Sequence, residues 1–112
     1  MASIRQNKIA RLLQKEIAEI FQMEQQNLFK GKMITVTVVR VVADMSMARI
    51  YLSVFPYKKE ENYLEYINQH AKFMRNQLGK KVRYQLRIVP ELYFFLDDSI
   101  DYAGRIDELL KQ

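Results

Sequence analysis

Basic side chains gather in one stretch of this sequence that contains no acidic residue. Between Tyr66 and Pro90 there is no aspartate or glutamate. The basic residues of that stretch are Lys72, Arg75, Lys80, Lys81, Arg83 and Arg87. Cations of this kind bind phosphate groups because they displace the counterions that phosphates hold in solution. The first hypothesis is therefore binding to a phosphate-rich partner, with Arg87 ranked below the other five because it can face solvent or pair with Glu91.

A second set of basic side chains lies near the N-terminus. Its members are Arg5, Lys8, Arg11 and Lys15. On a helical wheel the last three fall together, roughly opposite an apolar stripe, so they form a basic ridge. Glu16 and Glu19 dilute this charge, and an ordinary solvated helix face is the competing interpretation. The candidate RNA-binding residues are these four together with Lys72, Arg75, Lys80, Lys81 and Arg83.

Histidine and cysteine chemistry has little support in this chain. His70 is the only histidine, so a histidine-based metal site would lack a second imidazole. On a helix beside Ile67 and Met74 it is better explained as a half-buried packing residue. The absence of cysteine excludes a disulfide scaffold, a cysteine-ligated zinc site and thiol catalysis. We expect no metal site and no cofactor.

Acidic and hydroxyl side chains offer no better catalytic site. Asp97, Asp98 and Asp101 could be imagined as a cation site, but carboxylates before a helix are more simply explained as caps. Ser46 and Ser99 have no base placed near them by sequence. We therefore expect a protein that is not an enzyme.

Composition bounds the class of protein. At 112 residues, with 49% hydrophobic residues and only 3 Gly and 2 Pro, the chain is expected to fold as one ordered domain spanning residues 1–112. Its net charge of +5 favours an anionic partner, commonly nucleic acid. No apolar run approaches the roughly 18–20 residues of a membrane span, and the N-terminus lacks an apolar signal core. We expect a monomer in the cytoplasm that does not contact membranes.

The first half of the chain predicts a helix followed by a hairpin. Apolar residues recur at helical spacing over residues 3–25, with Ser3 as a plausible N-cap. The β-branched run 34–42 and the alternating run 48–55 predict two antiparallel strands. The alternation of the first strand breaks at Val38-Val39, which indicates a bulge or burial on both faces.

The second half predicts a helix, a strand and a final helix. Helical spacing returns from about residue 60, and Gly79 is the expected C-terminal stop, with Lys80, Lys81 and Arg83 following it. A third strand is expected over residues 84–96. We expect its buried face to carry Leu86, Ile88, Leu92, Phe94 and Leu96. Pro90 lacks an amide donor, so this strand is either at an edge or interrupted there. After Asp97, a short amphipathic helix carries Ile100, Ile106 and Leu110.

Several segments together resemble one known family. They are Arg5-Gln6-Asn7-Lys8-Ile9 through Lys15-Glu16-Ile17-Ala18, residues 41–54 (VVADMSMARIYLSV), residues 73–80 (FMRNQLGK), residues 86–92 (LRIVPEL) and residues 94–99 (FFLDDS). In this order, across nearly the whole chain, they are similar to ribosome-binding factor A, a bacterial small-subunit maturation factor.

The resemblance implies a fold and a function. The fold would be α+β and similar to a type II KH domain, with a three-stranded sheet packed against helices in the order α-β-β-α(kinked)-β-α. The function would be binding of immature 30S ribosomal subunits and their 16S rRNA, which assists late rRNA processing and subunit maturation. The resemblance implies no catalytic activity and no cofactor.

The chain departs from the expected pattern at two places. An ordinary KH domain brings its backbone against nucleotides with a Gly-x-x-Gly motif, and this sequence has none. Members of the resembling family often carry Ala-x-Gly at the kink, where this chain reads His70-Ala71-Lys72. Lys72 therefore places a cation where relatives have glycine.

One alternative function stays open from sequence. A KH-like module could bind proteins, or RNA in general, without a role in ribosome assembly. Tyrosine and phenylalanine suit both protein interfaces and base stacking. The candidates are Tyr51, Phe55, Tyr57, Tyr63, Tyr66, Tyr84 and Tyr93. Salt dependence separates an RNA-binding protein from a protein-docking module, because phosphate binding weakens steeply as salt rises.

Overall fold

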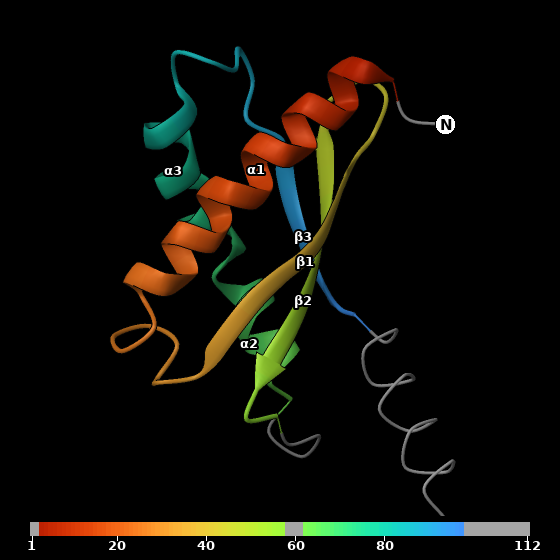
Figure 1. Cartoon of the computed structure of the whole chain (residues 1–112). Helices are drawn as coiled ribbons and strands as arrows, with labels where there is room; N and C mark the ends of the chain where they lie inside the picture. Colours follow the sequence, from red (N-terminus) through yellow and green to blue (C-terminus); the bar gives the residue numbers. More distant parts are fainter. Residues whose placement is uncertain (1–2, 58–61, 98–112) are drawn as a thin grey trace, which may run out of the picture.

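The computed structural model describes residues 3–57 and 62–97 (Figure 1). Its elements in chain order are α1 (Ile4–Met23), β1 (Met33–Val41), β2 (Met47–Phe55), α2 (Tyr63–Gln69), α3 (Ala71–Val82) and β3 (Glu91–Leu96). This α+β order confirms the expected KH-like arrangement, with α2 and α3 as the kinked helix. The final helix expected after Asp97 lies outside the described residues.

Helix α1 begins where the sequence predicts. The Gln6 amide donates to Ser3 Oγ at 3.1 Å, and the Ser3 amide donates to Gln6 Oε1 at 2.8 Å. This reciprocal capping box satisfies two amides that the first helical turn leaves without partners. Leu13 and Ile17 are fully buried on the opposite side from the basic ridge. The apolar stripe therefore holds α1 against the sheet.

Strands β1 and β2 form the expected antiparallel hairpin, with a bulge. Val36 pairs with Leu52 and Val38 with Tyr51, so Thr37 is the extra residue. The broken alternation did indicate a bulge, and the structure places it one residue before the break. The Thr37 hydroxyl lies 3.1 Å from the Tyr51 carbonyl oxygen. The bulge thus keeps the rest of β1 in register with its buried face toward the core.

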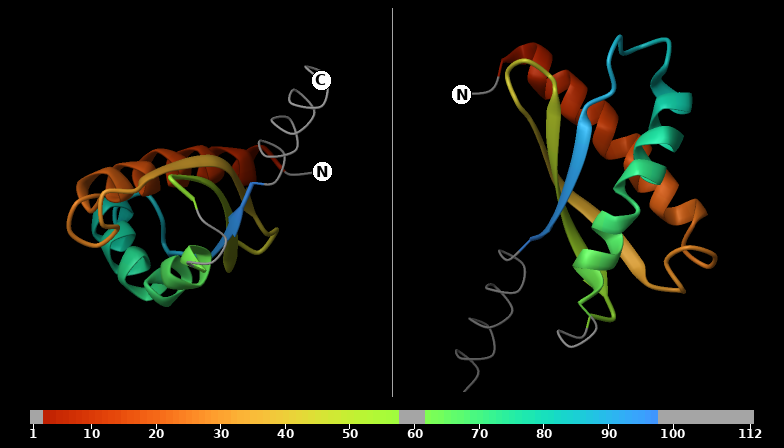
Figure 2. Two further views of the ribbon diagram at one scale, coloured as in Figure 1. Left: turned by 90° about the horizontal axis from the view of Figure 1, so that it is seen from below. Right: turned by 180° about the vertical axis from the view of Figure 1, so that it is seen from behind.

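The three strands make a mixed sheet with β2 at its centre. The strand order is β1-β2-β3, and β3 runs parallel to β2, with Ala48 opposite Leu92 and Ile50 opposite Phe94. Helix α1 lies along β1, whereas α2 and α3 lie beside β3 (Figures 1 and 2). Alternate strand residues on the helix side are buried and form the core with the helices. The backbone edges of β1 and β3 that point away from β2 are the two edges of the sheet.

The kink between α2 and α3 is centred on His70. The His70 amide donates to the Ile67 carbonyl, three residues back, at 3.0 Å. Its ring Nδ1 lies 2.9 Å from the Tyr66 carbonyl oxygen, which a regular helix would use for the His70 amide. A carbonyl oxygen only accepts, so Nδ1 carries the hydrogen. The imidazole therefore replaces a backbone bond at the point where the helix axis changes direction.

Two tyrosines of α2 hold the loop that follows α1. The Tyr63 hydroxyl donates to the Phe29 carbonyl at 2.9 Å, and the Tyr66 hydroxyl donates to the Leu28 carbonyl at 2.5 Å. Phe29 itself is fully buried in the core. Its ring lies 4.9 Å from the Phe21 ring, measured between centroids. The loop is thus tied to the core and to α2.

The expected helix stop at Gly79 was wrong. Helix α3 continues to Val82, so Lys80 and Lys81 lie in its last turn rather than after it. Met74, Leu78 and Val82 are fully buried at four-residue spacing. Burial of Val82 beside Leu78 stabilises one more helical turn, and this outweighs the local preference of glycine for a helix end.

The third strand is shorter than expected. It begins at Glu91, and residues 84–90 are irregular. Ile88, expected on the buried strand face, is 67% exposed. Pro90 lacks an amide and cannot donate a ladder hydrogen bond, which explains why pairing starts immediately after it. The Gln85 and Leu86 amides instead bond back to the Val82 carbonyl at the end of α3.

Candidate nucleic-acid interface

The basic ridge of α1 points away from the core. Lys8, Arg11 and Lys15 are all exposed, and Leu13 between them is buried on the opposite side. Arg5 is exposed as well, at a helical position about 60° around the axis from Lys8. Within the described residues, no ion pair engages these four side chains. They are therefore available to an anionic partner.

Helix α3 presents a second outward stripe. Lys72, Asn76 and Lys80 are exposed at four-residue spacing, so they lie along one line of the helix surface. At 1.5 Å per residue, the line from Lys72 to Lys80 is about 12 Å long. Asn76 was not considered from sequence, although its spacing between the two lysines places it there. Its amide can donate to phosphate oxygens between the two cations.

Arg75 faces a different direction from Lys72 and Lys80. Its guanidinium donates to the Val89 carbonyl through Nε at 3.2 Å and through Nη2 at 2.8 Å. These two bonds fix the irregular segment that leads into β3. The side chain remains exposed, and two of its five N–H donors are used in this way. Arg75 thus supports the fold and still offers donors to a ligand.

Lys81 is committed to contacts within the protein. Its ammonium nitrogen lies 3.1 Å from Glu19 Oε2 and 3.7 Å from Glu16 Oε2, and it links α3 to α1. The hydrogen bond and charge of Lys81 lower the pKa of Glu19 below its ordinary value. From sequence, Lys81 was expected to be a free phosphate contact, and the two glutamates were expected to dilute the α1 ridge. The structure brings all three together instead.

Arg83 follows α3 and is paired with an aromatic ring. Its guanidinium carbon lies 4.8 Å from the centroid of the Tyr84 ring. Tyr84 is 89% exposed, so the pair stands at the surface. A guanidinium over an exposed ring offers both a charge for phosphate and a flat face for a base. Arg83 is separate from the Lys72 and Lys80 stripe, because it lies beyond the helix end.

A hollow of about 200 Å³ lies between the start of α3 and β3. Its lining residues are Ala71, Lys72, Arg75, Glu91, Leu92 and Tyr93. The structure thus places two predicted cations next to Tyr93, which is 44% exposed. From sequence Tyr93 was one of seven aromatics without a rank, and only the packing of α3 beside β3 reveals its place. This hollow is the concave part of the candidate interface.

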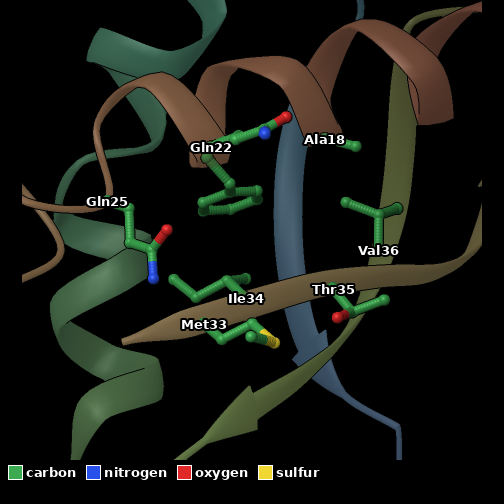
Figure 3. Close-up of a pocket in the computed structure, with 8 residues that line it drawn as sticks. Ala18, Gln22, Gln25, Met33, Ile34, Thr35 and Val36 are labelled. Atoms are coloured by element: carbon green, nitrogen blue, oxygen red, sulfur yellow. The ribbon is translucent and has the colours of Figure 1, made fainter. Parts of the chain in front are cut away.

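A larger hollow of about 340 Å³ lies between α1 and β1 (Figure 3). Its lining residues are Ala18, Phe21, Gln22, Gln25, Met33, Ile34, Thr35 and Val36. None of them carries a charge, so this hollow has nothing to neutralise a phosphate. The candidate nucleic-acid interface therefore lies on the outer faces of α1 and α3 and in the hollow beside Tyr93.

The residues considered for catalysis have other roles within the described part of the chain. His70 is half-buried, and its ring centroid lies 4.6 Å from that of Tyr66, as expected for a packing residue. The Ser46 hydroxyl donates to Asp44 Oδ1 at 2.7 Å in the hairpin turn. Together with the Ser46 amide, this bond lowers the pKa of Asp44 below its ordinary value. Asp98, Ser99 and Asp101 lie outside the described residues.

Residues 3–57 and 62–97 contain neither a candidate metal site nor a membrane-spanning helix. In these ranges no three His, Cys, Asp or Glu side chains gather in a way that could hold a metal ion. Among the helices of the same ranges, none combines the length and hydropathy that crossing a membrane requires.

Comparison with known proteins gives consistent matches along the chain. A family model described as ribosome-binding factor A matches residues 5–110. Ribosome-binding factor A of Cytophaga hutchinsonii is 44% identical over 112 residues, which cover 100% of this chain and 84% of that protein.

A crystal structure and a fitted homology model share the fold. The crystal structure of ribosome-binding factor A from Thermus thermophilus gives a TM-score of 0.65 at 26% identity, covering 81% of this chain and 94% of that one. A homology model of the Thermus thermophilus factor, fitted into a cryo-EM map of a 30S complex, gives 0.63 at 26% identity, with coverages of 80% and 91%.

Proposed function

Because this chain belongs to the ribosome-binding factor A family, we propose that it binds the small ribosomal subunit and its rRNA through the outer faces of α1 and α3. The similar Thermus thermophilus factor fitted into a 30S complex supports the choice of partner. The observation that carries the proposal is the arrangement of cations. Those on the two outer faces point to solvent, and the two acids of α1, Glu16 and Glu19, are engaged with Lys81 between the helices.

The structure supports a ranking of the contacts. The first rank holds five cations that lie on the α1 ridge or the α3 stripe and have no ion pair among the described residues: Lys8, Arg11, Lys15, Lys72 and Lys80. Arg83 with Tyr84 forms a separate contact at the end of α3. Arg5 ranks below the ridge because it lies off its line. Arg75 and Lys81 rank last because each holds part of the protein together.

The mechanism we propose is recognition of RNA shape. Rigid helices hold the cations at constant spacing, and folded rRNA presents phosphates at constant positions. A protein that fits one arrangement of phosphates better than another shifts the rRNA toward the arrangement that it binds. Binding of immature 30S subunits would in this way assist late processing and folding of 16S rRNA. It requires no catalytic group and no cofactor.

The same proposal places the protein in the cytoplasm as a single copy on each subunit. Small subunits assemble there in bacteria, and each subunit offers one set of phosphate positions. The exposed cations of α1 and α3 would then face RNA rather than a second copy of this chain.

Co-sedimentation with immature and mature small subunits at about 50 mM and about 200 mM salt tests the proposal. We expect enrichment on the immature particle at low salt and a steep loss at high salt. Equal pelleting at both salt concentrations would contradict phosphate binding and favour a protein-docking module. No pelleting with either particle would contradict the choice of partner.

A further inference from the structure

One face of the sheet carries no described helix and is chemically distinct from the helical side. The strand register aligns its outward residues in two neighbouring rows. One row consists of Arg40, Arg49 and Tyr93, and the next consists of Val38, Tyr51 and Phe95. Tyr93 and Phe95 are 44% and 40% exposed. None of these residues was ranked as a binding residue from sequence.

Two arginines face each other across the hairpin. Arg40 pairs with Arg49 in the register, and both are exposed. Side chains directly opposite on neighbouring strands have Cβ atoms about 5 Å apart, where like charges repel. Within residues 3–57 and 62–97 neither guanidinium has an acidic partner. A bound anion would neutralise this pair.

The acidic side chains of β3 and its end do not supply that anion. Glu91 accepts a hydrogen bond from the Tyr93 hydroxyl at 3.2 Å. Asp97 Oδ2 lies 2.5 Å from the Thr37 hydroxyl, beside the bulge. Both carboxylates therefore have partners of their own, and along the chain they lie before Tyr93 and after Phe95. The centre of the face is left basic and aromatic.

The aromatic row next to the arginines suits nucleic-acid bases. The Tyr51 and Phe95 rings are stacked, with centroids 5.5 Å apart and planes 28° from parallel. Exposed rings beside guanidinium groups are a usual platform for single strands, because unpaired bases stack on rings while phosphates meet the cations. A duplex cannot use such rings, since its bases are already stacked on one another.

We propose that this open sheet face binds single-stranded RNA, with bases stacked on Tyr93 and Phe95 and phosphates held by Arg40 and Arg49. Tyr93 also lines the hollow beside Lys72 and Arg75, so the strand has a continuous path from α3 across the edge of β3. The site goes beyond the proposed subunit contact, because it uses a different face and a different RNA structure. The inference does not depend on whether the small ribosomal subunit is the partner.

The test measures binding of a fluorescent RNA of about eight unpaired nucleotides by anisotropy at low salt. In Tyr93→Leu the affinity falls roughly tenfold, whereas Tyr93→Phe retains it, because stacking needs the ring but not the hydroxyl. In Arg40→Gln/Arg49→Gln the salt dependence, as the slope of log K against log salt, becomes shallower by about 1.4. The control Lys30→Gln removes a charge from an exposed position elsewhere and keeps the wild-type slope.

Two further measurements localise the site. NMR resonances of the Tyr93 and Phe95 rings shift on addition of the RNA, and thermal unfolding of the arginine variant without RNA shows no loss of stability. Shifts confined to α1 and α3 would overturn the proposal. So would equal losses of affinity in Tyr93→Leu and Tyr93→Phe, or destabilisation of the arginine variant, which would assign the arginines to the fold. If the wild-type protein binds the subunit but does not bind the oligonucleotide, this inference alone would be overturned.

Discussion

The outer ridge of α1 and Lys81 in the last turn of α3 carry the same kind of charge but use it differently. Lys8, Arg11 and Lys15 have no ion pair among the described residues. Lys81 instead joins α3 to Glu16 and Glu19 of α1. A basic stretch of sequence is available to a partner only where the fold leaves its charges without internal partners. Substitution should therefore affect binding in the first region and stability in the second.

Removal of the α1 ridge is expected to have the largest effect on binding. We expect Lys8→Gln/Arg11→Gln/Lys15→Gln to weaken small-subunit binding by roughly a hundredfold near physiological salt, since each lost phosphate contact removes one released counterion. Co-sedimentation measures the binding, and urea unfolding measures the stability, which should stay at the wild-type value. A variant that binds normally would show that the ridge is only a solvated surface.

A smaller effect is expected from the outward stripe of α3. Lys72→Gln/Lys80→Gln removes two cations and should weaken subunit binding by roughly tenfold or more. The matched control is Lys81→Gln, in the same turn as Lys80 but directed at α1. We expect the control to retain binding and to lose a little stability. Reversal of this order would show that the structure assigns the two lysines to the wrong roles.

Gly79 tests why α3 extends beyond the expected stop. A Cβ at this position would lie 3.7 Å from Val89 Cγ2, which is ordinary van der Waals contact. Because alanine favours a helix interior over glycine, Gly79→Ala should raise the free energy of unfolding by about 1 kcal/mol. Urea unfolding gives the value. A decrease would mean that the segment before β3 packs too closely on α3 to admit a methyl group.

The smallest expected effect is the pH dependence of the link between α1 and α3. Lys81 lowers the pKa of Glu19 in the folded protein, so the link contributes stability above the ordinary pKa of about 4.5. That contribution is lost as the pH falls through the lowered folded value. The difference in unfolding midpoint between wild type and Lys81→Gln should therefore shrink between pH 7 and pH 3. Asp44 also titrates in this range, but it is common to both proteins and cancels.

The sequence predicted those parts of the fold that depend on interactions between residues close together along the chain. Ser3 with Gln6 marks the start of α1, and the broken alternation before Val39 marks the bulge at Thr37. Pro90 was expected to place its strand at an edge or to interrupt it, and β3 is an edge strand that starts directly after Pro90. In each case the deciding interaction lies within a few residues along the chain.

Interactions between segments far apart along the chain decide the parts of the structure that could not be predicted from the sequence. Burial of Val82 in the core carries α3 past Gly79. Lys81 meets Glu16 and Glu19 only because α3 packs beside α1. The directions of the candidate cations therefore required coordinates, although their identities could be read from the sequence.

The position of β2 at the centre of the sheet has a consequence for the growing chain. Its antiparallel neighbour β1 precedes it by one short turn, but Met47 finds its parallel partner only at Glu91. During synthesis from the N-terminus, the hairpin can close early while the second edge of β2 stays unpaired until the last strand emerges. An unpaired strand edge invites pairing with other chains. The growing chain is therefore most prone to aggregation in the interval before β3 has been synthesised.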